Sequence, residues 1–185
     1  NKRLRKALRR VNLLRTEVLD YYKKYKINND LLELRNIITT SLLIIKGSLG
    51  RKKSIVVIIV ATTNSNNDRK IIKICQKCDV DYFVGSETNV QLRYYKAAKK
   101  FNISNIIRIT SDCPLMDIEI IKKIIKLFFK RKRQYVSNVI FPTYPNGMDV
   151  EMFSFESITK RTKIKINDYE KEHVTPFFIK KKIVK

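Results

Sequence analysis

The sequence predicts a three-layer α/β/α sandwich built on a mostly parallel sheet. Short β-branched runs alternate with amphipathic helical patterns between residues 55 and 131. Such an alternation favours parallel strands joined by crossover helices that cover both faces of the sheet. The composition agrees, because 185 residues with 44% hydrophobic side chains, 4 glycines and 4 prolines can enclose the core of one domain.

The elements of this alternation have local causes. Residues 55–61 are nearly all β-branched, which suits a strand buried on both faces. Asp117 is placed to cap a helix over 118–131, and Glu119 suits the positive end of that helix. The other expected elements are helices at 69–78 and 90–101 and strands at 81–84, 106–109, 135–139 and 148–153.

Residues 1–35 are interpreted as a basic helical segment of uncertain role, and residues 36–185 as the α/β domain. Apolar residues recur at helical spacing over 3–25, with Arg and Lys on the other faces. We expect the apolar stripe to dock on the domain, although a basic amphipathic helix could also lie on RNA or on a membrane surface. Residues 31–45 are apolar-rich and fit either a helix or a strand.

The formal net charge of +23 would favour a nucleic acid, an anionic membrane or a phosphate-bearing ligand as partner. Lysine is scattered over every segment, however, as a compositional bias would produce, whereas a binding patch clusters on one face. We therefore expect no nucleic-acid partner, with a basic module that binds RNA or another polyanion as the alternative. No apolar run approaches a membrane span and no signal-peptide pattern is present, so a cytoplasmic location is expected.

The three cysteines do not indicate a disulfide framework or a metal site. Cys75 and Cys78 form a single C-x-x-C, but a zinc site needs four ligands and the only histidine, His173, is remote. The pair also falls inside a helical pattern. Buried thiols are the better interpretation.

Three polar clusters follow strands of the predicted sheet, at residues 62–64, 85–87 and 110–112. In open α/β sheets, ligands bind at the carboxyl ends of the strands, so these clusters should share one edge. Asp112 stands where an apolar strand ends, and Pro114 prevents further ladder pairing. A carboxylate there suits Mg²⁺ shared with a substrate phosphate. The alternative is a turn in which Asp112 only accepts backbone N–H groups.

Other polar residues are candidates for the same edge. Arg93, in the helix after Ser86, could reach a base or a phosphate, or be a solvated helix arginine. Asp149 and Glu151 lie two apart on an expected strand and so face the same side. There they could accept sugar hydroxyl groups or form an exposed acidic edge. His173 could line a site or be a packed or surface side chain.

Several ordered motifs resemble those of the spore-coat polysaccharide biosynthesis cytidylyltransferases, relatives of the acylneuraminate and deoxy-octulosonate cytidylyltransferases. Each motif alone is weak, but together they run in a consistent order along the chain. The matching stretches are Val60-Ala61-Thr62-Thr63, Gly85-Ser86-Glu87, Arg93-Tyr94-Tyr95, Arg108-Ile109-Thr110-Ser111-Asp112-Cys113-Pro114-Leu115, Tyr135-Val136-Ser137-Asn138, Gly147-Met148-Asp149-Val150-Glu151-Met152-Phe153-Ser154 and Glu172-His173-Val174-Thr175-Pro176.

The resemblance implies a nucleotide-diphospho-sugar transferase fold and a defined reaction. CMP would pass from CTP to the hydroxyl of an acidic or nonulosonic sugar, with release of pyrophosphate, in surface polysaccharide biosynthesis. It also implies roles for individual residues: Asp112 as the catalytic Mg²⁺ ligand, Thr62, Ser86 and Arg93 near the cytidine, and Asp149, Glu151 and His173 on the sugar side.

The chain departs from the family pattern at both ends. Residues 1–35 hold no match to the Gly-Ser-x-Arg-x-x-x-Lys loop that cradles the triphosphate in the family, although residues 46–53 have similar ingredients. The family's second metal-binding aspartate is not found either. We therefore expect a domain incomplete at both ends. A catalytically inactive family member is a further alternative, and a homodimer is left open.

Overall fold

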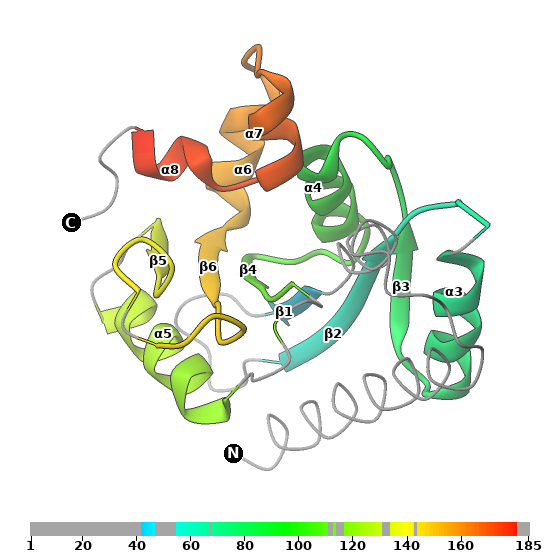
Figure 1. Cartoon of the computed structure of the whole chain (residues 1–185), viewed down its shortest axis with the longest axis horizontal. Helices are drawn as coiled ribbons and strands as arrows, with labels where there is room; N and C mark the ends of the chain where they lie inside the picture. Colours follow the sequence, from blue (N-terminus) through cyan, green and yellow to red (C-terminus); the bar gives the residue numbers. More distant parts are fainter. Residues whose placement is uncertain are drawn as a thin grey trace.

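The computed structural model shows one sheet between two layers of helices (Figure 1). Residues 1–41 lie outside the described part of the chain, and with them the whole predicted segment 1–35, its predicted helix over 3–25 and its boundary; Asp112 lies outside it as well. The residues that the structure describes are 42–46, 55–66, 68–110, 113, 117–130, 134–142 and 144–180.

Six strands of the described residues form the sheet in the order β3-β2-β1-β4-β6-β5. The strands are β1 (Leu42–Lys46), β2 (Ile55–Thr62), β3 (Asp81–Val84), β4 (Asn105–Arg108), β5 (Tyr135–Ser137) and β6 (Glu151–Ser154). The helices are α3 (Asp68–Lys77), α4 (Val90–Lys100), α5 (Ile118–Lys130), α6 (Phe155–Thr162), α7 (Asp168–His173) and α8 (Pro176–Lys180).

Four of these strands, β2, β3, β4 and β5, run in the same direction. β2 and β3 are parallel neighbours with α3 between them in the chain. β1 is antiparallel to both β2 and β4, and β6 is antiparallel to both β4 and β5. Residues 47–54 are all that connects β1 to β2, and a parallel crossover needs a dozen or more residues. Residues 31–45, whose sequence fits either a helix or a strand, therefore contribute to the antiparallel strand β1.

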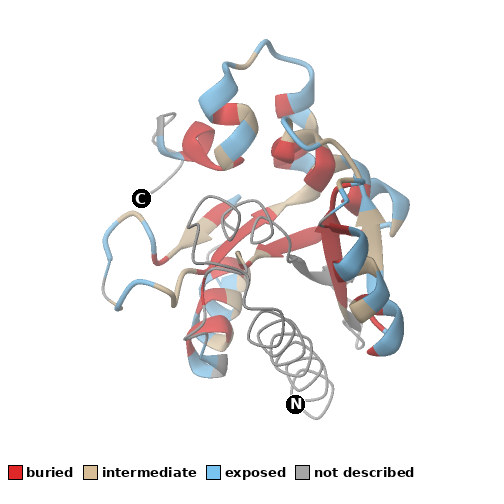
Figure 2. Ribbon diagram, turned by 45° about the vertical axis from the view of Figure 1, so that its right-hand side comes forward, coloured by how far each residue is buried: buried red, intermediate tan, exposed pale blue. Residues whose placement is uncertain are grey.

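Alternate residues of each central strand face opposite helical layers. On β2, Ile58 and Val60 pack with α3 and α5, whereas Ile59 and Ala61 pack against α4, α6 and α8. Figure 2 shows buried residues on the strands of the sheet and on parts of the helices around them. The predicted α/β/α sandwich is confirmed, because helices pack on both faces of the sheet. A sheet covered in this way needs strands that are apolar on both sides.

The helices after β6 form a cap that the sequence analysis did not predict. Ser154 caps α6, and Asn167 with Glu170 forms a capping box at the start of α7. Glu170 also pairs with Arg161 of α6, with 2.5 Å between Oε2 and Nη2. The Arg161 guanidinium lies 4.7 Å from the ring centroid of Phe177 in α8. One buried ion pair therefore links all three short helices.

Two local predictions are confirmed by contacts. The Glu119 N–H donates to Asp117 Oδ1 at 2.6 Å, so Asp117 caps α5 as expected. Cys75, Cys78 and Cys113 are all buried. Among the described residues, no helix combines the length and the apolar composition needed to cross a membrane.

We expect Phe153→Ala to lower the free energy of unfolding by about 3–5 kcal/mol, because the side chain is fully buried on β6, between β4 and β5. Phe141→Ala is the matched control, since Phe141 is 79% exposed, and should change stability by less than about 0.5 kcal/mol. Urea unfolding followed by circular dichroism measures both. Equal effects of the two substitutions would contradict the burial described above.

The thiols should be unreactive in the folded protein. Burial raises the pKa of the Cys75 thiol to about 12, so the thiolate that attacks disulfide reagents does not form near neutral pH. Because the folded pKa lies above the ordinary value, this group also favours folding less as the pH rises through the range from 9 to 12. Ellman's reagent should therefore label no cysteine in buffer and all three in urea. Rapid labelling in buffer would show that the thiols are accessible.

Candidate active edge of the sheet

The turns that follow β2 and β3 meet at the carboxyl edge of the sheet. Thr62 is the register partner of Val84, and the Gly85 N–H donates to the Thr62 carbonyl oxygen at 2.9 Å. Two of the three polar clusters predicted from the sequence are therefore neighbours in space. This edge is where open α/β sheets bind ligands.

A buried carboxylate holds the first of these turns in place. Asp68 is 2% exposed and its Oδ2 atom accepts three hydrogen bonds, from the Thr62 hydroxyl at 2.8 Å, the Thr63 N–H at 2.7 Å and the Thr63 hydroxyl at 2.6 Å. The predicted nucleotide ligand Thr62 thus directs its hydroxyl proton inward. Sequence reasoning missed Asp68, although an acidic residue directly before the expected helix at 69–78 was a signal for such a role.

Arg93 supports the second turn from beneath. Its side chain is 0% exposed, and Nη1 donates to the Ser86 carbonyl oxygen at 3.0 Å. Burial lowers the pKa of Arg93, while Tyr94 and the carboxylates of Asp68 and Glu87 oppose that shift. The Arg93 guanidinium therefore interacts electrostatically with a carboxylate at each turn, Asp68 at the first and Glu87 at the second.

Gly85 is required by this arrangement. A Cβ atom at residue 85 would lie 2.8 Å from the Phe83 ring and 2.9 Å from Arg93 Cγ, closer than carbon atoms approach. Ser86 is half-buried, and its hydroxyl oxygen accepts the Asn89 N–H at 3.0 Å. The Gly85-Ser86 turn is thus fixed by the strand before it and the helix after it.

A buried charged cluster occupies the other half of the edge. Glu151 is 3% exposed, pairs with Arg108 on β4 through Oε2, and accepts the Tyr135 hydroxyl through Oε1 at 2.7 Å. Burial lowers the pKa of Arg108, but the Glu151 carboxylate outweighs burial and the pKa is raised. Sequence reasoning missed Arg108, although a charge within an apolar strand signals a buried partner.

Asp149 does not share a strand with Glu151. β6 begins at Glu151, so the expected strand over 148–153 started too early and the alternation argument does not reach Asp149. Asn138 fixes the segment before β6 instead, because its side chain donates to the Met148 carbonyl at 2.8 Å and accepts the Val150 N–H at 2.8 Å. Half-buried Asp149 is held between these two bonds.

His173 is the last residue of α7 and is half-buried. Its ring centroid lies 4.4 Å from that of Tyr169 on the same helix. The next residue, Val174, has a φ of 65° and a buried side chain. A β-branched residue in this region is a conformational outlier, so the backbone after His173 is strained.

The metal prediction is not tested by these contacts. Asp112 lies outside the described residues. Within the part of the chain that the structure describes, no group of three or more His, Cys, Asp or Glu side chains could hold a metal ion. The Mg²⁺ site stays a prediction that depends on Asp112.

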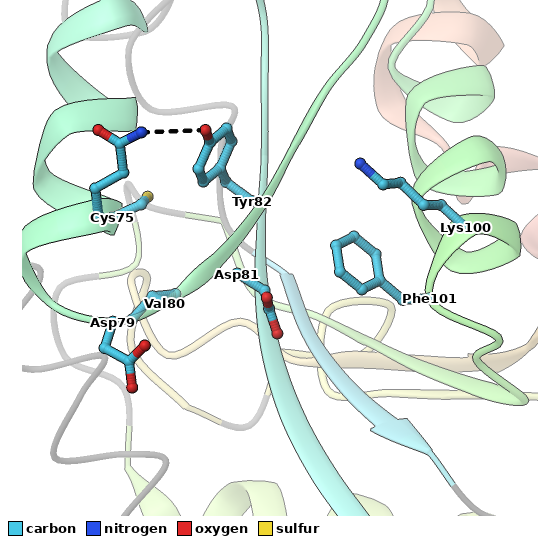
Figure 3. A pocket seen from close by; sticks show the side chains of 8 residues that line it. Cys75, Asp79, Val80, Asp81, Tyr82, Lys100 and Phe101 are labelled. Carbon is cyan, nitrogen blue, oxygen red and sulfur yellow. Dashed lines mark hydrogen bonds between the residues drawn. The ribbon is translucent and has the colours of Figure 1, made fainter.

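A pocket of about 530 Å³ lies at the opposite edge of the sheet, where β3 begins and where α3 and α4 end (Figure 3). Tyr82 accepts a hydrogen bond from the Gln76 side chain at 3.3 Å on one side of it, and Lys100 lies on the other. The pocket contains none of the residues predicted for the site. It is lined by Cys75, Gln76, Asp79, Val80, Asp81, Tyr82, Lys100 and Phe101.

The protein has an α/β fold, in which most strands share one direction and helices cover both faces of the sheet. Its polar turns lie at the strand ends, the edge at which open α/β sheets bind ligands. The sequence identifies the family more closely. The family model of the cytidylyltransferases matches residues 47–184, which is more than half of the chain. The chain belongs to the cytidylyltransferase family.

A solved structure supports this assignment. A cytidylyltransferase from Leptospira borgpetersenii serovar Hardjo-bovis (strain JB197) superposes with a TM-score of 0.63 and 35% sequence identity. The match covers 66% of this chain and 52% of that chain.

Two curated proteins are similar over shorter stretches. The uncharacterized protein MJ1063 of Methanocaldococcus jannaschii is 38% identical over 112 residues, which are 60% of this chain and 44% of that protein. This chain therefore spans less than half the length of that relative. The L-aspartate oxidase of Yersinia pestis is 47% identical over 51 residues, which are 28% of this chain and 10% of the oxidase. So short a match does not show membership of the oxidase family.

Removal of the Asp68 carboxylate should loosen the turn after β2. Asp68→Ala leaves three buried donors of Thr62 and Thr63 without their acceptor, so the free energy of unfolding should fall by about 1–3 kcal/mol. Asp81→Ala, at an exposed residue, is the control and should have little effect. Thermal or urea unfolding compares the two. A stable Asp68→Ala protein would show that the turn holds without this carboxylate.

Proposed function

We propose that this chain is the nucleotide-binding part of a sugar cytidylyltransferase. It transfers CMP from CTP to the hydroxyl of an acidic or nonulosonic sugar and releases pyrophosphate, as a step in surface polysaccharide biosynthesis. The observation that carries the proposal is the cytidylyltransferase match over residues 47–184, which includes every residue of the candidate edge. The Leptospira structure, described as a cytidylyltransferase, adds support from its fold and from its 35% sequence identity.

We assign the nucleotide to the turns after β2 and β3. Thr62 and Arg93 act there by supporting the two turns from below, since both side chains are buried. Ser86 is the half-buried residue of this set, and its turn lies at the carboxyl edge of the sheet. Small residues and backbone groups at such turns can approach a base and a ribose closely.

We assign the sugar to the side formed by β6 and α7. Asp149 is half-buried, and the Asn138 bonds to Met148 and Val150 fix the backbone on either side of it. His173 is half-buried at the end of α7. The Glu151 carboxylate is already bound by Arg108 and Tyr135. Glu151 would therefore influence the sugar through the shape and charge of the site beneath it.

Asp112 is the proposed Mg²⁺ ligand. A carboxylate that follows β4 in the sequence has the donor chemistry that Mg²⁺ prefers when it is shared with phosphate oxygens. Bound there, the ion would neutralise charge on the triphosphate during transfer.

The test is a thermal shift with CTP and Mg²⁺. A ligand at a concentration one hundred times its Kd stabilises a protein by about 2.7 kcal/mol, so the Tm should rise by about 5–10 °C. Asp112→Asn should abolish the rise, whereas Asp81→Asn, at the start of β3 on the opposite edge, should retain it.

The same samples separate the alternatives. Pyrophosphate release with CTP and an acidic sugar supports the transferase, and CTP binding without release identifies an inactive member of the family. Absence of a shift at millimolar CTP in the wild-type chain counts against nucleotide binding. Binding to unrelated RNAs that weakens steeply with salt would favour the polyanion-binding alternative.

A further inference from the structure

Asn138 bridges the backbone on the two sides of Asp149. Its side-chain Nδ2 donates to the Met148 carbonyl oxygen at 2.8 Å, and its Oδ1 accepts the Val150 N–H at 2.8 Å. Its own N–H donates to the Val150 carbonyl oxygen at 3.3 Å. The residue that follows β5 therefore binds both neighbours of a carboxylate that belongs to the proposed sugar side.

These bonds continue the pairing of β5 with β6 in a modified form. The last register pair joins Ser137 to Glu151, and Asn138 lies opposite Val150 one step further along. In an antiparallel ladder, residues that form a hydrogen-bonded pair exchange two bonds between their backbones. Here the Val150 N–H donates to the Asn138 side chain instead, so the backbone that follows β5 can leave the ladder at this residue. The side chain thus replaces strand pairing next to Asp149.

Burial makes the bridge difficult for water to replace. Asn138 and Val150 are both buried. The side chains of Met148 and Val150 also pack in the apolar layer that contains α3 and α5. A buried N–H or carbonyl group that loses its partner is costly, so these bonds persist in the folded chain. The residues before and after Asp149 are therefore fixed by hydrogen bonds as well as by packing.

The chemistry of the bridge requires a carboxamide. The segment presents a carbonyl oxygen at Met148 and an N–H at Val150, so the bridging group needs one donor and one acceptor. An asparagine side chain has both, whereas an aspartate carboxylate only accepts and an apolar side chain does neither. Pairing of β5 with β6 does not need this side chain, because a strand ladder uses backbone groups. The identity of residue 138 is thus matched to the backbone around Asp149.

We propose that Asn138 is a positioning residue of the candidate site: by binding the backbone before and after Asp149, it fixes the position from which that carboxylate meets the sugar. The bridge itself stands on the contacts above. Its consequence for the sugar rests on the proposed function, so the two are tested separately.

Hydrogen exchange of the Val150 amide tests the bridge. In ¹⁵N NMR spectra this amide should exchange slowly in the wild-type chain, because its buried N–H is bound. Asn138→Ala removes the acceptor, and exchange at Val150 should become about tenfold to a hundredfold faster. The Ile107 amide on β4 reports on the stability of the whole sheet, and its rate should change less. A Val150 rate that does not change relative to Ile107 overturns the proposal.

Ser137→Ala is the matched control variant. Ser137 Oγ accepts the Val139 N–H at 2.8 Å, so the substitution removes a side-chain hydrogen bond from the same turn but none beside Asp149. It should leave exchange at Val150 and KM for the sugar unchanged. If Asn138→Ala does not fold, Asn138→Leu replaces it, because leucine is similar in shape but neither donates nor accepts. The same faster exchange at Val150 is expected, and a wild-type rate overturns the proposal.

A double-mutant cycle tests the link to Asp149. The substrates are CTP and either N-acetylneuraminate or deoxy-octulosonate, whichever the wild-type chain accepts. Asn138→Ala should raise KM for the sugar or lower kcat by about tenfold to a hundredfold, while KM for CTP stays constant. In an Asp149→Ala background the same substitution should have almost no further effect, since the carboxylate that it positions is gone. Effects that multiply in the double variant, or a loss confined to KM for CTP, contradict the proposed role.

The two measurements separate this inference from the proposed function. If the wild-type chain releases no pyrophosphate with either sugar, the proposed function fails, and the consequence for the sugar fails with it. The exchange rates then still decide whether Asn138 holds the backbone around Asp149. If the wild-type chain is active but Asn138→Ala changes neither KM nor kcat, this inference fails and the proposed function stands.

Discussion

The ion pair between Arg108 and Glu151 is the constraint on which the rest of the sheet depends. A charge removed from water is tolerated only with a partner, and here the two charges lie on neighbouring strands in direct register. A slip of β6 by one residue would turn Glu151 to the other face, into the apolar layer of α3 and α5. The pair therefore fixes the register of β6, and with it the segment tied to Asn138 and the start of α6.

Helix α4 connects the two halves of the candidate edge. Its consecutive residues Arg93 and Tyr94 are both buried, one beneath the turn at Ser86 and the other against the cluster of Arg108 and Glu151. A shift of this helix would disturb both halves together. The proposed nucleotide and sugar sides are thus built on one rigid element, as accurate sites require.

The sequence predicted the elements up to residue 131 well, because each apolar period there is strong and is bounded by turn residues. It could not predict the direction of β1, which follows from the short connection to β2 and from pairing with β4, a contact distant in sequence. The helices after β6 were missed, although Asn167-x-x-Glu170 is a capping-box pattern that could have located α7.

The same division holds for the candidate site. Residue types that suit nucleotide chemistry were visible, and Thr62 and Ser86 do lie at adjacent turns. Burial was not visible, so Arg93 and Glu151 were expected to face ligand, whereas both are held inside by protein partners. Tyr135 and Asp68 gave weak signals because their roles depend on contacts between separate elements.

The burial of every native thiol has a practical consequence for studying motion. Phe141 lies in the segment between β5 and β6 and is largely exposed. A cysteine introduced at position 141 would be the single site open to a maleimide dye, without removal of Cys75, Cys78 or Cys113. The segment that carries Asp149 could then be followed by fluorescence as substrates are added, in an otherwise native chain.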